Sequence, residues 1–241
     1  MGMAPLAIYL AQAGYAVTGE DDAMTEEVRV LLNRERVSVM SIPDDSELVV
    51  YSSAIAKTHP AYVAATARNL PLVRRGEMLA ELVREKKLVA VCGSHGKTTT
   101  TAMLITALRR ANFPAGYILG GLFGDETSPA RVGSNDWVVA EIDESDGTIE
   151  RFTPTVTVAV NLDWDHPDHY RQLADLERTF AALFTRTSTA VLVSDACALS
   201  GRVVNLATDA GVAAGVALPT FETFGRAGVF SGVVADDPAD G

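Results

Sequence analysis

A short stretch between a hydrophobic run and four threonines carries the residue types of a phosphate-binding loop. Residues 89–101 read VAVCGSHGKTTTT. Glycines let the backbone N–H groups turn toward an anion, and the start of the following helix adds partial positive charge. In this pattern Lys97 bridges the terminal phosphates and the Thr98 hydroxyl reaches a magnesium ion. The residues predicted to contact a nucleotide phosphate are Gly93, Ser94, His95, Gly96, Lys97, Thr98 and Thr99.

The loop departs from the strict pattern G-x-x-x-x-G-K-[ST] at one position, since Val91 stands where that pattern has glycine. The alternative is a glycine-led turn into a Thr-rich helix without a ligand. Four consecutive β-branched threonines make a poor helix interior, so stability alone does not explain them. We therefore favour the phosphate loop.

Carboxylates follow a second apolar run, in VVAEIDESDG at residues 138–147. Glu141 lies near the end of the predicted strand, and Asp143, Glu144 and Asp146 come after it. Ligands of open parallel sheets bind beyond the carboxyl ends of the strands, and magnesium prefers oxygen donors. These carboxylates are thus candidates to hold magnesium beside Lys97, and the alternative is a solvated acidic loop.

A third polar cluster, NLDWDHPDHY at residues 161–170, also follows a β-branched run. Zinc is one candidate, but the cluster has no cysteine and its spacing matches no zinc pattern. With a phosphate loop nearby, His166 is predicted to bind magnesium or contact a phosphate, although a structural histidine is the alternative. All three clusters follow strands, and this shared placement supports each of them.

Weaker signals lie earlier in the chain. Ser52 and Ser53 end a predicted strand, where hydroxyl and N–H groups suit a nucleotide's phosphates. Arg74 and Arg75 can pair with phosphate or carboxylate. Turn chemistry and surface solvation explain these residues equally well, and Cys92 is predicted to be a small packing residue.

Short β-like runs alternate with helical patterns, which predicts an α/β fold with a mostly parallel sheet. Residues 1–86 are predicted to form an incomplete Rossmann-like region, because they open in a helix with no strand and glycine loop before it. Residues 87–241 are predicted to form a P-loop region, in which the segment 201–241 could not be assigned. Predicted helices lie at 3–14, 25–35, 60–69, 76–87, 96–112 and 173–186, and predicted strands at 15–21, 48–55, 70–75, 88–93, 137–146, 155–161 and 189–195.

Bulk composition excludes several classes of protein. The formal net charge of −11 disfavours nucleic-acid and anionic-membrane binders, so a phosphate ligand must be held locally. Two cysteines are too few for a disulfide framework, which makes a reducing cytoplasm the expected location. No uninterrupted apolar run reaches the roughly 18 residues of a membrane span, and the start lacks a signal-peptide pattern.

The combined motifs resemble the Mur ligases. Their loop reads G-[ST]-x-G-K-[ST]-[ST] and lacks the first glycine of the strict pattern, as GSHGKTTT does here. The segments SSAI, RRGEMLAELV, AEIDESDG and N-x-x-x-D-H follow in the family's order, from residue 1 to about 195. The resemblance implies a cytoplasmic ligase of peptidoglycan synthesis that uses ATP and magnesium to join L-alanine to UDP-N-acetylmuramate through an acyl phosphate.

The resemblance also assigns roles to residues. It implies that Thr98, Glu141 and His166 hold magnesium, that Lys97, Glu141 and His166 serve catalysis, and that the UDP-sugar contacts Ser52, Ser53 and Ala54. It further implies that residues 1–86 lack the family's first strand and most of its glycine loop, and that the C-terminal ligase domain is absent, so that the chain alone is inactive. The alternatives are a ligase that attaches a murein tripeptide to the same sugar nucleotide, or a non-catalytic nucleotide-binding relative.

Overall fold

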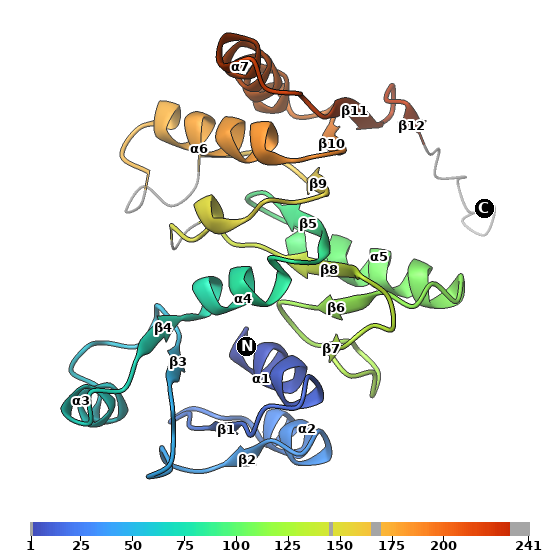
Figure 1. The fold of residues 1–241 in the computed structure, drawn as a ribbon. Coiled ribbons are helices and arrows are strands. Elements are labelled where there is room, and N and C mark those ends of the chain that lie inside the picture. The colour runs from blue at the N-terminus through green and yellow to red at the C-terminus, as the bar shows by residue number, and fades with distance from the viewer. Residues whose placement is uncertain (1, 145–146, 165–169, 232–241) are drawn as a thin grey trace, which may run out of the picture.

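The computed structural model describes residues 2–144, 147–164 and 170–231, which fold as an α/β protein around an eight-stranded sheet (Figure 1). The strand order is β12-β11-β10-β9-β5-β8-β6-β7. Neighbouring strands run parallel except for the antiparallel pair β6–β7. The strands are β5 (Lys87–Cys92), β6 (Gly116–Ile118), β7 (Ala130–Arg131), β8 (Trp137–Glu141), β9 (Val156–Ala159), β10 (Ala190–Ser194), β11 (Thr220–Gly225) and β12 (Phe230–Ser231).

The central strand β5 explains why this part of the sequence reads as a continuous apolar run. Strands covered on both faces bury successive side chains in opposite directions. Ala90 and Cys92 lie in a core cluster shared with helices α1 (Met3–Gln12), α4 (Arg75–Val83) and α6 (Leu173–Arg186). Val91 lies in a second cluster with Ile105 of helix α5 (Lys97–Arg110). Alternate residues of one strand thus join two helical layers to the sheet.

The sequence before β5 forms two separate parallel strand pairs, not one sheet. Strand β1 (Thr18–Gly19) pairs with β2 (Ser38–Val39), and β3 (Val49–Tyr51) pairs with β4 (Leu72–Arg74). Helices α2 (Glu26–Arg34) and α3 (Pro60–Ala67) form where the sequence predicts them, and α3 has proline in its first turn. The observed strands are shorter than the predicted ones.

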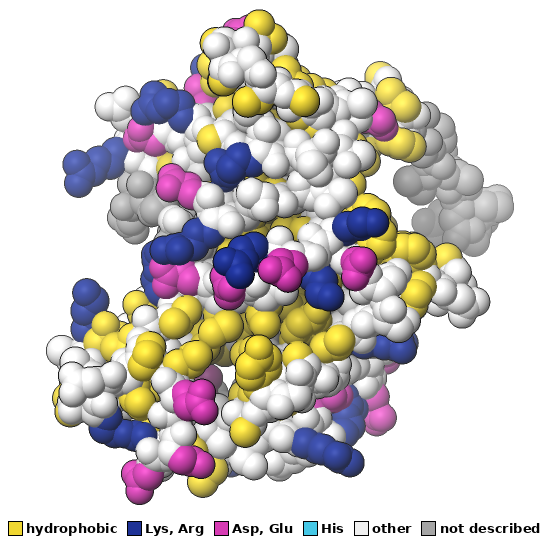
Figure 2. Space-filling view, viewed as in Figure 1, with side chains coloured by type: hydrophobic (Ala, Val, Ile, Leu, Met, Phe, Trp, Pro, Cys, Tyr) yellow, Lys and Arg dark blue, Asp and Glu magenta, His cyan; other side chains and the backbone are white. Residues whose placement is uncertain are grey.

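Helix α4 crosses between this N-terminal part and the large sheet (Figure 1). Its buried face carries Leu79, Ala80 and Val83. Its outer side shows acidic and basic side chains side by side, above a band of hydrophobic side chains (Figure 2). Ion pairs there join Glu77 to Arg74, Glu77 to Arg151, and Glu81 to Arg84. The charged row marks the solvent side of an amphipathic helix.

The unassigned segment is ordered as helix α7 (Ala198–Ala214), followed by β11 and β12. Alanine favours helix, and Gly215 ends α7 with a positive φ of 65°. Helix α7 packs on α6, where Arg202 pairs with the buried Glu177 at 2.8 Å. The sequence left this segment unassigned, and the structure describes it as far as residue 231. In the described parts of the chain, we find no helix long and apolar enough to span a membrane.

Candidate nucleotide-phosphate site

The predicted phosphate loop connects the end of β5 to the start of α5, as the sequence indicates. Gly93 has φ 119° and Gly96, the residue that caps α5, has φ 77°. Residues other than glycine rarely adopt these φ angles. A Cβ atom on Gly93 would also overlap the carbonyl oxygen of Asn161. Both predicted glycines are therefore required by the turn.

The segment after β9 holds this loop in place. The side-chain amide of Asn161 accepts a hydrogen bond from His95 N at 2.9 Å and donates one to His95 O at 2.8 Å. Ser94 Oγ donates to Asp163 O at 2.9 Å and accepts from Asp163 N at 2.8 Å. These bonds explain Asn161 and Asp163 as supports of the loop, a role that sequence reasoning missed because β9 had to be known as the neighbour of β5.

Lys97 folds back over its own loop. Its Nζ donates to Gly93 O at 2.6 Å and to Ser94 O at 3.4 Å, and it lies 3.2 Å from Glu144 Oε1. The Glu144 side chain is only 1% exposed. Burial raises the pKa of Glu144, while the nearby ammonium of Lys97 opposes that rise. The sequence placed Glu144 near the loop but did not foresee this ion pair.

Thr98 and Glu141 meet as the sequence predicts. Thr98 Oγ1 donates to Glu141 Oε2 at 2.9 Å, and Gly120 N donates to the same oxygen at 3.2 Å. A Cβ atom on Gly120 would overlap the Glu141 carboxylate, so glycine is needed there. A hydroxyl and a carboxylate at one helix N-terminus form a hard-oxygen donor set, which fits magnesium. Gly120 gave no signal in the sequence.

The third predicted magnesium ligand, His166, lies outside the described residues, as do Asp146, Asp165, Asp168 and His169. Within the described ranges, no group of three or more His, Cys, Asp or Glu side chains is placed to hold a metal. Thr99 is exposed on the first turn of α5. Buried Cys92 packs below the loop as predicted, and burial raises the pKa of its thiol.

The predicted sugar-nucleotide residues lie elsewhere. Ser52, Ser53 and Ala54 form the turn after β3, where Ala54 N donates to Ser52 Oγ at 3.3 Å. Figure 1 shows β3 on the other side of α4 from β5. The structure thus brings Lys97, Thr98 and Glu141 together, but does not bring residues 52–54 to them.

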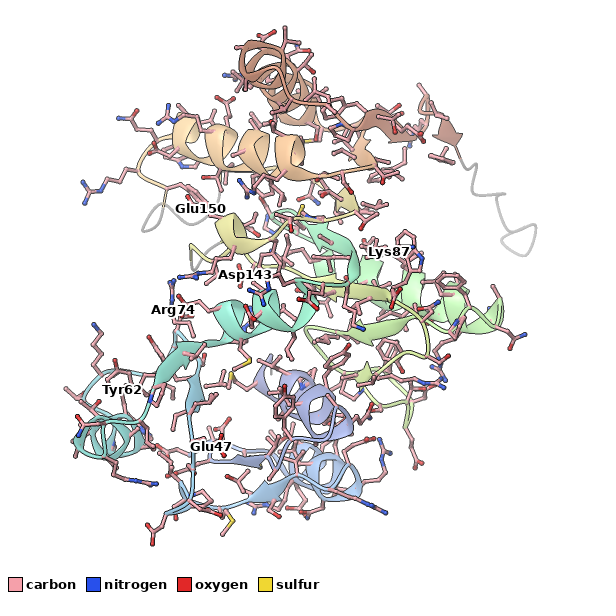
Figure 3. All side chains as sticks on the ribbon, in the orientation of Figure 1. Glu47, Tyr62, Arg74, Lys87, Asp143 and Glu150 are labelled. Carbon is pink, nitrogen blue, oxygen red and sulfur yellow. The ribbon has the colours of Figure 1, made fainter. Side chains whose placement is uncertain are left out.

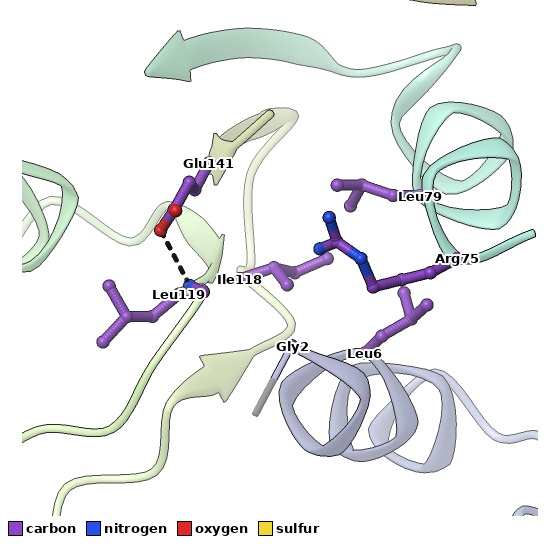
Figure 4. A pocket seen from close by; sticks show the side chains of 8 residues that line it. Gly2, Leu6, Arg75, Leu79, Ile118, Leu119 and Glu141 are labelled. Carbon is purple, nitrogen blue, oxygen red and sulfur yellow. Dashed lines mark hydrogen bonds between the residues drawn. The ribbon is translucent and has the colours of Figure 1, made fainter. Parts of the chain in front are cut away.

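The two arginines at the start of α4 behave differently. Arg74 pairs with Glu77 at 3.1 Å, whereas Arg75 Nη2 lies 3.7 Å from Asp143 Oδ2. Figure 3 labels Arg74 and Asp143 beside α4. Arg75 also points toward Glu141 across a small cavity of about 10 Å³ (Figure 4). The cavity is lined by Gly2, Leu6, Arg75, Leu79, Ile118, Leu119, Gly120 and Glu141. Arg75 therefore links α4 to the acidic loop.

Comparison with known proteins gives consistent matches. The sequence profile of the family described as "Mur ligase family, catalytic domain" matches residues 1–87. UDP-N-acetylmuramate–L-alanine ligase of Azorhizobium caulinodans is 40% identical over 186 residues, and that of Bartonella henselae is 41% identical over 184 residues. Each match covers 75% of this chain and 39% of the relative.

Solved structures agree on the fold. UDP-N-acetylmuramate–alanine ligase from Thermotoga maritima has a TM-score of 0.80 and 24% identity, over 95% of this chain and 51% of that one. A murein peptide ligase from Psychrobacter arcticus has a TM-score of 0.76 and 19% identity, over 98% and 54%. The chain spans about 39% of the length of the curated relatives it matches. Over three quarters of its length, the chain is similar in sequence to Mur ligases, and the family profile matches its first 87 residues.

Proposed function

We propose that this chain carries the nucleotide-phosphate part of an ATP-dependent ligase that joins L-alanine to UDP-N-acetylmuramate in cytoplasmic peptidoglycan synthesis. The observation that carries the proposal is the contact of Thr98, next to Lys97 at the start of α5, with Glu141 at the end of β8. The names of the relatives that are about 40% identical support the choice of substrates.

The residues suit the chemistry of that reaction. A carboxylate becomes a good acyl donor only when one of its oxygens is converted to a leaving group, which γ-phosphoryl transfer from ATP provides. Such a transfer depends on positioning and on neutralising charge, without a covalent enzyme nucleophile. The loop from Gly93 to Thr99 would orient the phosphates through its N–H groups, and Lys97 would neutralise their charge. Thr98, Glu141 and His166 would hold magnesium, which neutralises further phosphate charge when bound.

We assign the two parts of the chain to two ligands. Residues 1–86 would contact the UDP-sugar through Ser52, Ser53 and Ala54, and residues 87–241 would bind ATP. The strand pairs before β5 and the large sheet after it support this division. The acceptor L-alanine and complete ligation are proposed for the whole protein, because this chain spans 39% of its matched relatives.

An assay of phosphate release tests the reaction. A full-length protein containing this chain should release phosphate from ATP only when UDP-N-acetylmuramate and L-alanine are both present. Release with a murein tripeptide but not with L-alanine would assign the other acceptor. ATP binding without any release would instead indicate a non-catalytic relative and would contradict the proposal.

A binding experiment tests the loop in the chain itself. We expect weak ATP binding by calorimetric titration and a marked loss in Lys97→Ala, because that change removes the cation at the loop. Lys86→Ala is the matched control, since Lys86 is an exposed lysine on the segment before β5. Equal ATP affinity of Lys97→Ala and the wild type would remove the loop from the proposed site.

A further inference from the structure

Glu144 is a buried carboxylate to which the proposed reaction gives no role. Its side chain is 1% exposed, although it lies on a loop after β8. Tyr170 Oη donates to the backbone oxygen of Glu144 at 2.8 Å, and Ile142 N donates to Val91 O at 3.0 Å. Tyr170 is itself buried. The backbone from Ile142 to Glu144 is therefore fixed against the sheet at one end and against a buried aromatic side chain at the other.

The carboxylate of Glu144 is directed at Lys97. Its two oxygens lie 3.2 and 3.3 Å from Lys97 Nζ. An ammonium group has three N–H donors, and Lys97 has three acceptor groups around it, namely Gly93 O, Ser94 O and this carboxylate. A phosphate can therefore bond to Lys97 only by taking a direction that one of these acceptors now uses.

The two sides of the ion pair differ in their freedom to move. Glu144 is enclosed, whereas the Lys97 side chain is 14% exposed and has a flexible four-carbon stem. Gly93 and Ser94 belong to the turn itself, so their carbonyl groups remain wherever the loop is intact. Lys97 is thus the group that can exchange partners, and of its three acceptors named above only the Glu144 carboxylate is charged.

We propose that Glu144 is a positioning residue for Lys97, which holds the ammonium at the base of the loop and competes with phosphate for it. Nucleotide affinity then reflects the transfer of Lys97 from the carboxylate to the phosphate. The inference rests on the proposed function of the loop. It adds that the buried carboxylate of Glu144 lowers the affinity of the loop for nucleotide and fixes the position of the Lys97 ammonium.

A purely structural ion pair makes the opposite prediction for nucleotide binding. Glu144→Gln keeps the shape of the side chain and one oxygen acceptor but removes the charge. If Glu144 only supported the fold, this change would loosen the acidic loop and leave ATP affinity equal or weaker. If Glu144 competes with phosphate, Lys97 becomes free to meet ATP and affinity rises.

The experiment is a double-mutant cycle on ATP affinity, measured by calorimetric titration of this chain. The variants are Glu144→Gln, Lys97→Met and the double variant, with Glu150→Gln as the control at an exposed glutamate. We expect Glu144→Gln to bind ATP at least about fivefold more tightly than the wild type, because fivefold is the upper value for a solvent-exposed ion pair and this pair is largely buried. Lys97→Met should bind more weakly, the double variant should show no gain over Lys97→Met, and Glu150→Gln should match the wild type.

Other outcomes separate the two proposals. Equal or weaker ATP binding by folded Glu144→Gln overturns the role of Glu144, while a loss in Lys97→Met keeps the phosphate loop. A gain that persists in the double variant also overturns it, because the effect would not pass through Lys97. Unchanged binding by Lys97→Met overturns both. If Glu144→Gln does not fold, Glu144→Asp replaces it: its shortened carboxylate should give tighter ATP binding, and equal or weaker binding overturns the role.

Discussion

Replacing Gly93 with alanine should strongly destabilise the protein for two reasons, backbone strain and steric overlap. Substitutions at two other glycines can measure these causes separately. The backbone of Gly93 has φ 119°, which a residue with a side chain adopts at a cost of about 1–3 kcal/mol. The added methyl group would also overlap the Asn161 carbonyl oxygen, and overpacking of this kind costs about 1–3 kcal/mol. We therefore expect the free energy of unfolding to fall by about 2–6 kcal/mol.

Two matched substitutions test each cause alone. Gly14 has φ 97° but has open space where a Cβ atom would stand, so Gly14→Ala should cost only the backbone strain of about 1–3 kcal/mol. Gly201 lies inside α7 with open space and no positive φ, so Gly201→Ala should stabilise the protein by about 0.5–1 kcal/mol.

The three variants are compared by urea denaturation, with unfolding followed by circular dichroism. The expected order of stability is Gly201→Ala, wild type, Gly14→Ala and Gly93→Ala. If the free energy of unfolding of Gly93→Ala were within about 0.5 kcal/mol of the wild-type value, the reasoning would be refuted, because surface substitutions without structural consequence fall in that range. Equal losses for Gly14→Ala and Gly93→Ala would also refute it, because they would show that contact with Asn161 adds nothing.

Two further predictions concern stability away from the loop. The hydrogen bonds from Arg74, and then the charge of Arg151, hold the pKa of Glu77 below its usual range. The stabilising effect of Glu77 is therefore present above the unfolded pKa of about 4.3 and is lost as the pH falls through the lowered folded pKa. The difference in stability between the wild type and Glu77→Gln, measured by denaturant unfolding, should close in acid, and a difference that widens in acid would contradict this. Phe180 is fully buried beside Phe184, so Phe180→Ala should cost about 3–5 kcal/mol, whereas Val212→Ala at an exposed position of α7 should stay within about 0.5 kcal/mol of the wild type.

Local patterns in the sequence predicted much of the fold. Helices α5 and α6 and strands β8 and β10 lie within the predicted ranges, and β5 begins one residue before its predicted range. Helix α6 has a strong apolar period, whereas α5 was predicted from the glycine loop that precedes it and the strands from their apolar runs. Short strands such as β6 and β7 were missed, since two or three residues carry no measurable period. Helix α7 was missed because alanine, glycine and valine are mixed along it and its apolar face is not distinct.

The candidate site shows the same division between local and distant information. Lys97 and Thr98 could be predicted because they stand in one contiguous motif. The pairing of Lys97 with Glu144 spans 47 residues, and the support of His95 by Asn161 spans 66. Both depend on β8 and β9 flanking β5, and strand order cannot be derived from periodicity. The sequence therefore predicted that Thr98 and Glu141 lie together at this edge, but not the contacts of Lys97 with Glu144 or of His95 with Asn161.

The position of Val91 explains why this loop has no glycine there. Val91 still belongs to β5, is fully buried, and packs in the cluster that joins the sheet to α5. Its neighbours in the ladder are Glu141 on β8 and Val158 on β9, and its carbonyl oxygen accepts from Ile142 N. A glycine would remove a core side chain and weaken the strand that places Glu141. The turn needs glycine only from residue 93, where the backbone leaves the sheet and passes against Asn161. The apparent defect in the motif is thus a strand that runs two residues further before the loop begins.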